Sequence, residues 1–264
     1  MELASERKAR LDLAIALPVY NEACGIAEFL NEIAASFFDV NFAVIVVDDC
    51  STDLTKQELD RLASSRLNLV SQRNTNNLGH GPSTISGLKI AVSWNPQFVI
   101  AVDGDGQFLG KDLRKVYDEL RRGQIRIVEG VRGHQDVPLF RKAVSFMVRV
   151  LVGIRCSAIP QDANTPLRGY RTEALKEILA FLPGDAMTPN LLISAIARSE
   201  RVNIIEVPVA TRSRRGPVQQ GSTWGRPMSD YLPSRIFLRF CSRALYQWFS
   251  LRNVSKGRRA SKRS

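Results

Sequence analysis

The sequence predicts an α/β fold with a mostly parallel central sheet and helices on both faces. Four short apolar runs rich in β-branched residues alternate with stretches of helical periodicity. The runs are apolar throughout instead of alternating with polar residues, which is typical of strands buried on both sides. Strands separated by helices pair in parallel, because each helix returns the chain to the starting edge of the sheet.

The expected elements follow one another in strict alternation. The strands are LAIALPV (13–19), FAVIVVD (42–48), LNLVSQ (67–72) and FVIAVD (98–103). The helices cover residues 25–37, 53–65, 82–93 and 111–122, and a further strand near Val207 precedes a basic loop. A chain of 264 residues with 44% hydrophobic content can bury one sizeable core. We therefore expect one compact domain over residues 1–230 and a tail over residues 231–264.

Most of the net charge of +11 lies in that tail. No acidic residue follows Asp230, whereas nine Lys and Arg residues do, so the rest of the chain is nearly neutral. Within SRIFLRFCSRALYQWFSL (234–251), Arg235, Arg239 and Arg243 recur every four residues, which predicts a basic amphipathic helix. Such a helix is suited to lying on an anionic membrane surface. The alternatives are packing on the body, a membrane-protein partner and, least favoured, nonspecific nucleic-acid binding.

The sequence gives two indications of the cellular compartment. No run of eighteen residues lacks a charge, and MELASERKAR at the N-terminus lacks the apolar centre of a signal peptide. We therefore expect a cytoplasmic protein that lies peripherally on the cytoplasmic face of a membrane. Cys24, Cys50, Cys156 and Cys241 are widely separated and have no neighbouring His, which predicts ordinary thiols instead of a zinc site or a disulfide framework.

Polar residues gather where the predicted strands end. PVYNE (18–22), DDCSTD (48–53), RNTNNLGHGP (73–82) and DGDGQ (103–107) each follow one strand. Loops at the carboxyl ends of parallel strands meet at one edge of the sheet, where ligands bind. Any one of these stretches could simply cap the next helix. Caps alone do not explain why four carboxylates, those of Asp48, Asp49, Asp103 and Asp105, are expected at this edge. Clustered carboxylates repel one another unless a cation or hydrogen-bond donors compensate their charge.

The stretch DGDGQF (103–108) predicts a site for a hard divalent cation shared with a diphosphate. A calcium EF-hand loop is excluded, because its sixth position would be Phe108 instead of Gly and its twelfth Arg114 instead of Glu. Mg²⁺ or Mn²⁺ takes only one or two protein carboxylates and completes its coordination with phosphate oxygens and water. NNLGHGP suits the approach of a phosphate to a helix start, but it lacks the Lys of a P-loop.

Together these motifs carry a resemblance to a known family. The ordered series ALPVYNE, VVDDCSTD, NNLGHGP, VDGDGQF, EGVR and QDANTPLRGYR resembles the inverting glycosyltransferases of family 2 over residues 12–225. The soluble, single-domain polyprenyl-phosphate sugar transferases, such as those that make dolichol-phosphate mannose, are the most similar group. The resemblance implies the GT-A nucleotide-sugar-binding fold, with Rossmann-like topology, and a nucleotide-diphosphosugar donor.

The resemblance also assigns roles on the donor side. The metal ligands for Mg²⁺ or Mn²⁺ would be Asp103, Asp105 and Gln107. The donor-binding residues would be Pro18, Tyr20, Glu22, Asp49, Asn77, Gly79, Asp103 and Asp105. A divalent cation would stabilise the negative charge that develops on the leaving diphosphate. Asp105 is therefore counted with the catalytic residues.

The acceptor side is expected in the second half of the chain. Asp162 precedes Gly169, Tyr170 and Arg171, as an acidic residue does in the family. The less favoured alternative is that Asp162 makes an Asx turn with Asn164 before Pro166. Arg132 and Arg141 are candidates for binding an acceptor phosphate, because a guanidinium binds phosphate bidentately. Both could instead face solvent.

A basic loop after Val207 resembles the family's flexible loop that closes over the donor. Arg212, Arg214 and Arg215 would screen the charges of diphosphate and acceptor, and Arg214 is counted with the catalytic residues. Ser222, in the Gly-Ser pair that ends the loop, would bind the acceptor or a phosphate. An exposed basic loop that binds nothing is the simpler alternative.

These residues favour transfer of a sugar from a nucleotide diphosphate to a polyprenyl phosphate at a membrane. A phosphate acceptor is already anionic and needs no general base, so Asp162 would position the acceptor or the metal. The alternative is transfer to a saccharide hydroxyl with Asp162 as general base. A domain that only binds nucleotide or nucleic acid is the non-enzymatic alternative.

Overall fold

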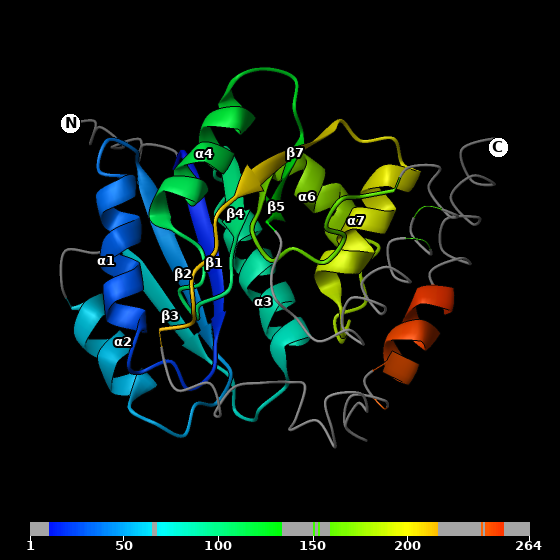
Figure 1. Ribbon diagram of the computed structural model, residues 1–264. Helices are drawn as coiled ribbons and strands as arrows, with labels where there is room; N and C mark the ends of the chain where they lie inside the picture. The colour runs from blue at the N-terminus through cyan, green and yellow to red at the C-terminus, as the bar shows by residue number, and fades with distance from the viewer. Residues whose placement is uncertain are drawn as a thin grey trace, which may run out of the picture.

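The computed structural model describes residues 11–64, 68–133, 159–215 and 241–250, together with the single residues 150, 153 and 239. Seven strands form one sheet in the order β3-β2-β1-β4-β6-β5-β7 (Figure 1). All neighbouring strands pair in parallel except β6, which runs antiparallel to β4 and β5. The predicted mostly parallel α/β fold is confirmed.

The first half of the chain supplies four parallel strands and their helices. In chain order the elements are β1 (Leu13–Val19), α1 (Ile26–Ser36), β2 (Phe42–Asp48), α2 (Thr55–Ala63), β3 (Leu69–Arg73), α3 (His80–Ser93), β4 (Phe98–Ala101) and α4 (Gly110–Arg121). The first two strands have their predicted bounds. Strand β4 ends two residues early because its pairing with β6 stops at Ala101, after which Val102 still donates a hydrogen bond to Ala16 of β1.

The second half extends the sheet beyond β4. Its elements are β5 (Ile127–Arg132), β6 (Arg168–Arg171), α6 (Thr172–Leu179), α7 (Pro189–Ser199) and β7 (Ile204–Val209). Only the last of these strands is expected from the sequence. The predicted site residues Arg141 and Ser222 and most of the predicted tail lie outside the described residues.

The sheet separates two layers of core side chains. On one face, Leu13, Ile15 and Leu17 of β1 pack with α1, α2 and α4. On the other face, Ala14 and Ala16 pack with α3, α6 and α7. Figure 1 shows these helices on the two sides of the sheet. Burial on both faces explains why β1 is apolar at every position.

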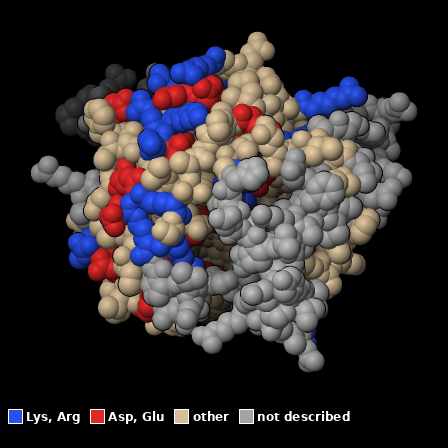
Figure 2. All heavy atoms as spheres, in the orientation of Figure 1, with Lys and Arg blue, Asp and Glu red and all other residues tan. Residues whose placement is uncertain are grey.

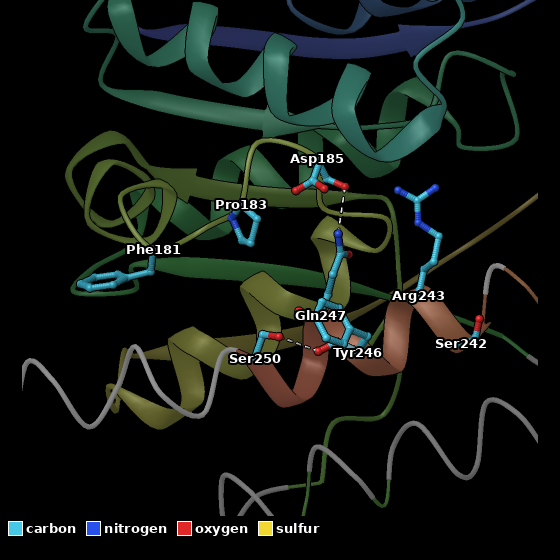
Figure 3. Close-up of a pocket in the computed structure, with 8 residues that line it drawn as sticks. All are labelled: Phe181, Pro183, Asp185, Ser242, Arg243, Tyr246, Gln247 and Ser250. Atoms are coloured by element: carbon cyan, nitrogen blue, oxygen red, sulfur yellow. Dashed lines mark hydrogen bonds between the residues drawn. The ribbon is translucent and has the colours of Figure 1, made fainter.

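The C-terminal helical segment, residues 241–250, packs on the body. Trp248 is 5% exposed and belongs to the core layer around α7. Gln247 accepts a hydrogen bond from the Met187 amide at 2.8 Å and donates one to the Asp185 carbonyl at 3.1 Å (Figure 3). Trp248 is therefore a core residue, which agrees with the alternative that this segment packs on the body. Within the described residues, no helix is long and apolar enough to span a membrane.

Candidate active site

The loops that follow β1, β2 and β4 meet at one edge of the sheet. The Asp49 amide donates to the Val19 carbonyl at 2.9 Å, and the Gly104 amide donates to the Pro18 carbonyl at 3.2 Å. A Cβ atom on Gly104 would lie 2.3 Å from Cγ1 of Val19, so only glycine permits this approach. Pro18 and the DGDGQ loop are thereby held side by side, as the sequence predicts.

The two acids after β2 have protein partners. Asp48 pairs with the Arg73 guanidinium at 2.6 Å and accepts the Ser51 amide at 2.9 Å. Asp49 is buried and accepts three hydrogen bonds of 2.8 Å, from the Asn74 side chain and from the amides of Leu78 and Gly79. The pair after β2 is thus compensated by an arginine and by hydrogen-bond donors, the latter being one of the two forms of compensation that the sequence allows. Asp49 instead holds the loop that carries the predicted donor residues Asn77 and Gly79.

The two acids after β4 are less completely compensated. Asp105 accepts the Gln107 amide at 3.0 Å, and Nε2 of His80 lies 3.4 Å from Oδ1 of Asp103. Burial, and then the neighbouring Asp103 charge, raises the pKa of Asp105 to about 6. His80, the first residue of α3, is a site neighbour that the sequence-based assignment missed. The available signal for this position was the glycine before the helix start. In the structure Gly79 has a φ of +92°, directly before His80.

The oxygen donors of this loop fit a hard divalent cation. Asp103, Asp105 and Gln107 offer two carboxylates and one amide oxygen, the ligand types that Mg²⁺ and Mn²⁺ prefer. Burial and the Asp103 charge disfavour the ionised form of Asp105, and a bound cation would favour it. Among the described residues no three His, Cys, Asp or Glu side chains form a metal cluster. A cation here would therefore need further ligands from phosphate or water.

Glu22 and Tyr20 continue from the end of β1. Glu22 is buried, its amide donates to Oγ1 of Thr55 at 2.8 Å, and its carboxylate forms an ion pair with Arg214. Burial raises the pKa of Glu22 to about 7, although the Arg214 guanidinium acts in the opposite direction. Tyr20 is half-buried at the same strand end. Glu22 thus meets Arg214 directly, which the sequence did not predict.

The basic segment 210–215 lies along the DGDGQF loop. Thr211 forms an antiparallel bridge with Phe108, the Arg212 amide donates to the Gln107 carbonyl at 2.9 Å, and the Arg215 amide donates to the Asp105 carbonyl at 3.3 Å. The segment therefore lies beside the loop that is predicted to bind the metal.

The three arginines of that segment already pair with acids of the β1–α1 region. Arg212 pairs with Glu32 at 2.5 Å, Arg214 pairs with Glu22, and Arg215 pairs with Glu28 and Glu32 at 2.6 Å each. Figure 2 shows basic and acidic side chains next to one another over the left and upper parts of the molecule. The segment is therefore not an exposed loop without partners. Its three arginines are also not unpaired groups that wait for an anion.

Asp162 and Arg132 form a bidentate ion pair. Nε of Arg132 donates to Oδ2 at 2.7 Å and Nη2 donates to Oδ1 at 3.1 Å. Burial alone would lower the pKa of Arg132, but Asp162 raises it above its usual value, with further contributions from Asp103 and Asp105. The pair thus lies within electrostatic reach of the predicted metal loop. Asp162 also accepts the Asn164 amide at 3.3 Å, so the Asx turn is present as well.

A buried ion network supports the Asp162 turn. Arg168 is fully buried and pairs with Glu129 at 2.5 Å, and Arg198 pairs with the same carboxylate at 2.7 Å. Arg168 also donates to the carbonyls of Ala163 and Thr165 at 2.8 and 2.9 Å. These hydrogen bonds hold the backbone of the turn that follows Asp162. The sequence-based assignment missed this network.

Gly169, Tyr170 and Arg171, the Gly-Tyr-Arg segment of the Asp162 motif, pack the fold together. A Cβ on Gly169 would lie 2.5 Å from Cγ1 of Val116, and Tyr170 is fully buried. Arg171 donates to the carbonyls of Ile125, Leu120 and Gly123 at 2.8, 3.1 and 2.5 Å. These residues attach α4 to the sheet and do not reach the site.

The C-terminal helical segment borders a separate hollow. The cavity of about 510 Å³ lies between this helix and residues 181–185, and Arg243 and Tyr246 line it (Figure 3). None of the predicted donor, acceptor or metal residues lines it. The adjoining turn nevertheless packs close to the site, because a Cβ on Gly81 would lie 2.1 Å from the Ala186 carbonyl oxygen.

Comparison with known proteins decides the family. The model of "Glycosyl transferase family 2" matches residues 14–179, which is more than half of the chain. The chain belongs to glycosyl transferase family 2. It is therefore a glycosyltransferase that uses a nucleotide sugar, and the non-enzymatic alternative is not retained. The GT-A fold predicted from the resemblance is also confirmed.

Curated family 2 relatives and solved structures agree with this assignment. The UDP-N-acetylglucosamine–dolichyl-phosphate N-acetylglucosaminyltransferase of Methanococcus voltae is 28% identical over 74% of this chain and 83% of its own length. The dodecaprenyl-phosphate galacturonate synthase of Rhizobium johnstonii is 24% identical over 88% of this chain and 69% of its own. Glucosyl-3-phosphoglycerate synthase from Mycobacterium tuberculosis, solved with Mn²⁺ and UDP, matches with a TM-score of 0.61 at 18% identity, over 92% of this chain and 81% of its own.

The cysteines agree with the predicted ordinary thiols where the structure describes them. Cys24, Cys50 and Cys241 are free. Cys156 lies outside the described residues.

Proposed function

We propose that the chain is an inverting, metal-dependent enzyme that transfers a sugar from a nucleotide diphosphate to a polyprenyl phosphate. The observation that carries this proposal is the Asp103–Asp105 loop, held beside Pro18 and the segment 210–215, together with the bidentate Arg132–Asp162 pair. The charges of Asp103 and Asp105 also act on Arg132. One pair suits a cation and a diphosphate, and the other suits a second phosphate. Relatives named for dolichyl-phosphate and dodecaprenyl-phosphate acceptors support this acceptor class.

On the donor side, Asp103, Asp105 and Gln107 would hold Mg²⁺ or Mn²⁺. When bound, the cation neutralises the negative charge that grows on the leaving diphosphate. Pro18, Tyr20, Glu22, Asn77 and Gly79 would contact base, ribose or phosphate. Asp49 acts through the loop it holds. The positive charge of Arg214 acts to lower the pKa of Asp105, which supports a role for Arg214 beside the diphosphate.

On the acceptor side, Arg132 would bind the incoming phosphate and Asp162 would hold Arg132 in place. Both Asp162 oxygens already accept hydrogen bonds from this guanidinium, which suits a positioning role. A phosphate monoester is anionic at neutral pH and can attack the sugar C1 without losing a proton. Attack opposite the leaving diphosphate inverts the configuration at C1.

Replacing Asp162 by Asn separates this mechanism from transfer to a saccharide hydroxyl. General base catalysis contributes about 10²–10⁴-fold. Under the positioning role, D162N therefore loses less than about 100-fold in kcat and keeps the pH profile of the native enzyme. Asp118→Asn is a matched control, because Asp118 pairs with Arg114 at 3.1 Å on α4. A larger loss with a shifted pH profile supports the hydroxyl acceptor instead.

We extend the proposal to the membrane surface. On the C-terminal helical segment 241–250, Arg243, Leu245, Tyr246 and Phe249 remain exposed, and Arg239 before it is exposed as well. Basic and apolar side chains on one exposed helix suit the headgroup region of an anionic leaflet, here the cytoplasmic face. The exposed residues, and not Trp248, would make this contact.

Vesicle sedimentation tests the membrane contact. The double variant Leu245→Ser with Phe249→Ser should lose binding to phosphatidylglycerol vesicles, whereas Ser242→Ala, at another exposed helix position, should keep it. Deleting the tail is a poorer test, because it removes the buried Trp248. Equal binding by both variants, or binding to RNA or to a membrane protein in place of vesicles, contradicts this part of the proposal.

A donor panel tests the reaction itself. UDP- and GDP-sugars are incubated with polyprenyl phosphate and Mn²⁺ or Mg²⁺, and release of nucleoside diphosphate is followed. One donor should react, only with both cation and lipid phosphate present. Turnover that survives EDTA, or that is absent with every donor, contradicts the proposal.

A further inference from the structure

Glu32 of α1 connects two segments that are far apart in the sequence. Its Oε1 accepts the amide of Gly110, the first residue of α4, at 2.7 Å. Its Oε2 accepts hydrogen bonds from Arg212 at 2.5 Å and from Arg215 at 2.6 Å. A carboxylate can accept this many bonds, because its two oxygens offer about four lone-pair sites. No motif pointed to Glu32.

Through Arg212 and Arg215, Glu32 also reaches the backbone of the metal loop. Arg212 donates from Nε to the Gly106 carbonyl at 2.7 Å and from its amide to the Gln107 carbonyl, while the Arg215 amide donates to the Asp105 carbonyl. Three consecutive carbonyls of the loop are thus bound to the segment that Glu32 holds. The Gly110 contact fixes the end of the same loop.

Two glycines provide the space for this arrangement. A Cβ on Gly25 would lie 2.6 Å from Cβ of Arg215, and a Cβ on Gly106 would lie 2.9 Å from its Cδ. Burial would raise the pKa of Glu32, but its bonds to Arg212 and Gly110 hold that pKa below its usual value. Glu32 is therefore charged while it binds both guanidiniums.

We propose that Glu32 is a positioning residue that joins the DGDGQ loop and the Arg212–Arg215 segment into one preorganised unit for the cation and the diphosphate. This inference rests on the proposed function. Glu32 itself touches neither ligand. Without the charge of Glu32, Arg212 loses its acidic partner and Arg215 keeps only Glu28. The loop then loses the support of its carbonyls and of its end at Gly110.

Glu32→Gln tests this role with Mn²⁺ alone as the probe. Partners that orient metal ligands typically change metal affinity or activity about 10–100-fold when replaced. Isothermal titration should therefore show E32Q binding Mn²⁺ about 10–100-fold more weakly than the native chain. Amide hydrogen exchange over residues 105–110 should be faster in the metal-free variant.

Glu58→Gln is the matched control, because Glu58 also lies on a helix and pairs with an arginine, Arg61, at 2.8 Å. It should bind Mn²⁺ like the native chain. In turnover, E32Q should lose kcat while the KM for the lipid phosphate stays within about twofold, since the acceptor pair is separate. If E32Q does not fold, Arg212→Gln removes the same ion pair and is measured in the same way.

E32Q with native Mn²⁺ affinity and native loop exchange, or with a lowered Tm as its only change, overturns the inference. Failure of the proposed function looks different, because the native chain would then turn over no donor. The Mn²⁺ titration would still decide the role of Glu32.

Discussion

Mn²⁺ binding should weaken as the pH falls below about 6, because a proton and the cation compete for Asp105. Burial and the charge of Asp103 raise the pKa of this carboxyl to about 6. Below that value the site must lose one proton for each cation bound. At pH 5 only about one Asp105 in eleven is ionised, so the apparent Kd for Mn²⁺ should rise about tenfold between pH 7 and pH 5. An ordinary Asp would give almost no change over this range.

Isothermal titration with Mn²⁺ between pH 5 and pH 7.5 measures this slope directly. In Asp105→Asn the affinity should be low and nearly independent of pH. Asp60→Asn, an exposed carboxylate on α2, should keep both the native affinity and the native slope. A flat profile for the native chain, or an unchanged Kd in D105N, would refute the assignment of Asp105 as the titrating ligand.

Four further predictions concern stability. Glu129→Gln leaves buried Arg168 without its charged partner and should cost about 3–5 kcal/mol in urea unfolding; a loss below about 1 kcal/mol would contradict the network. Gly104→Ala should cost about 1–3 kcal/mol through its contact with Val19, whereas Gly123→Ala, with open space around its Cβ, should not. Trp248→Ala should cost about 3–5 kcal/mol, and equal stability would mean that the C-terminal helix does not pack on the body. Because burial raises the pKa of Glu22 to about 7 from 4.5, the folded chain binds more protons than the unfolded chain between those values, so its unfolding free energy should fall as the pH rises through this window. Glu22→Gln should remove that slope, and an unchanged slope would contradict the burial of Glu22.

The first half of the fold could be predicted from the sequence because its strands are buried on both faces. Strands β1 and β2 are apolar at nearly every position, and their bounds follow directly. Strand β5 was missed because Glu129 interrupts its apolar run, and only the structure shows that Arg168 and Arg198 compensate this charge. Buried ion pairs join residues distant in the sequence, so no local pattern reveals them.

The candidate site, like the fold, could be predicted only in part from the sequence. The sequence places Asp103 and Asp105 at a strand end, and the structure keeps them together. The sequence could not show that Asp49 accepts hydrogen bonds from the amides of Leu78 and Gly79, nor that Arg214 pairs with Glu22. Side-chain partners across loops depend on tertiary packing, which motif spacing does not encode.

The most direct test of the central claim is the structure of the reaction product. Incubation of the active nucleotide sugar with polyprenyl phosphate and Mn²⁺ should yield a glycosyl phosphopolyprenol, detected by mass spectrometry. Proton NMR should show its anomeric configuration inverted relative to the donor. A product glycosylated on a saccharide hydroxyl, or one with retained configuration, would contradict the account.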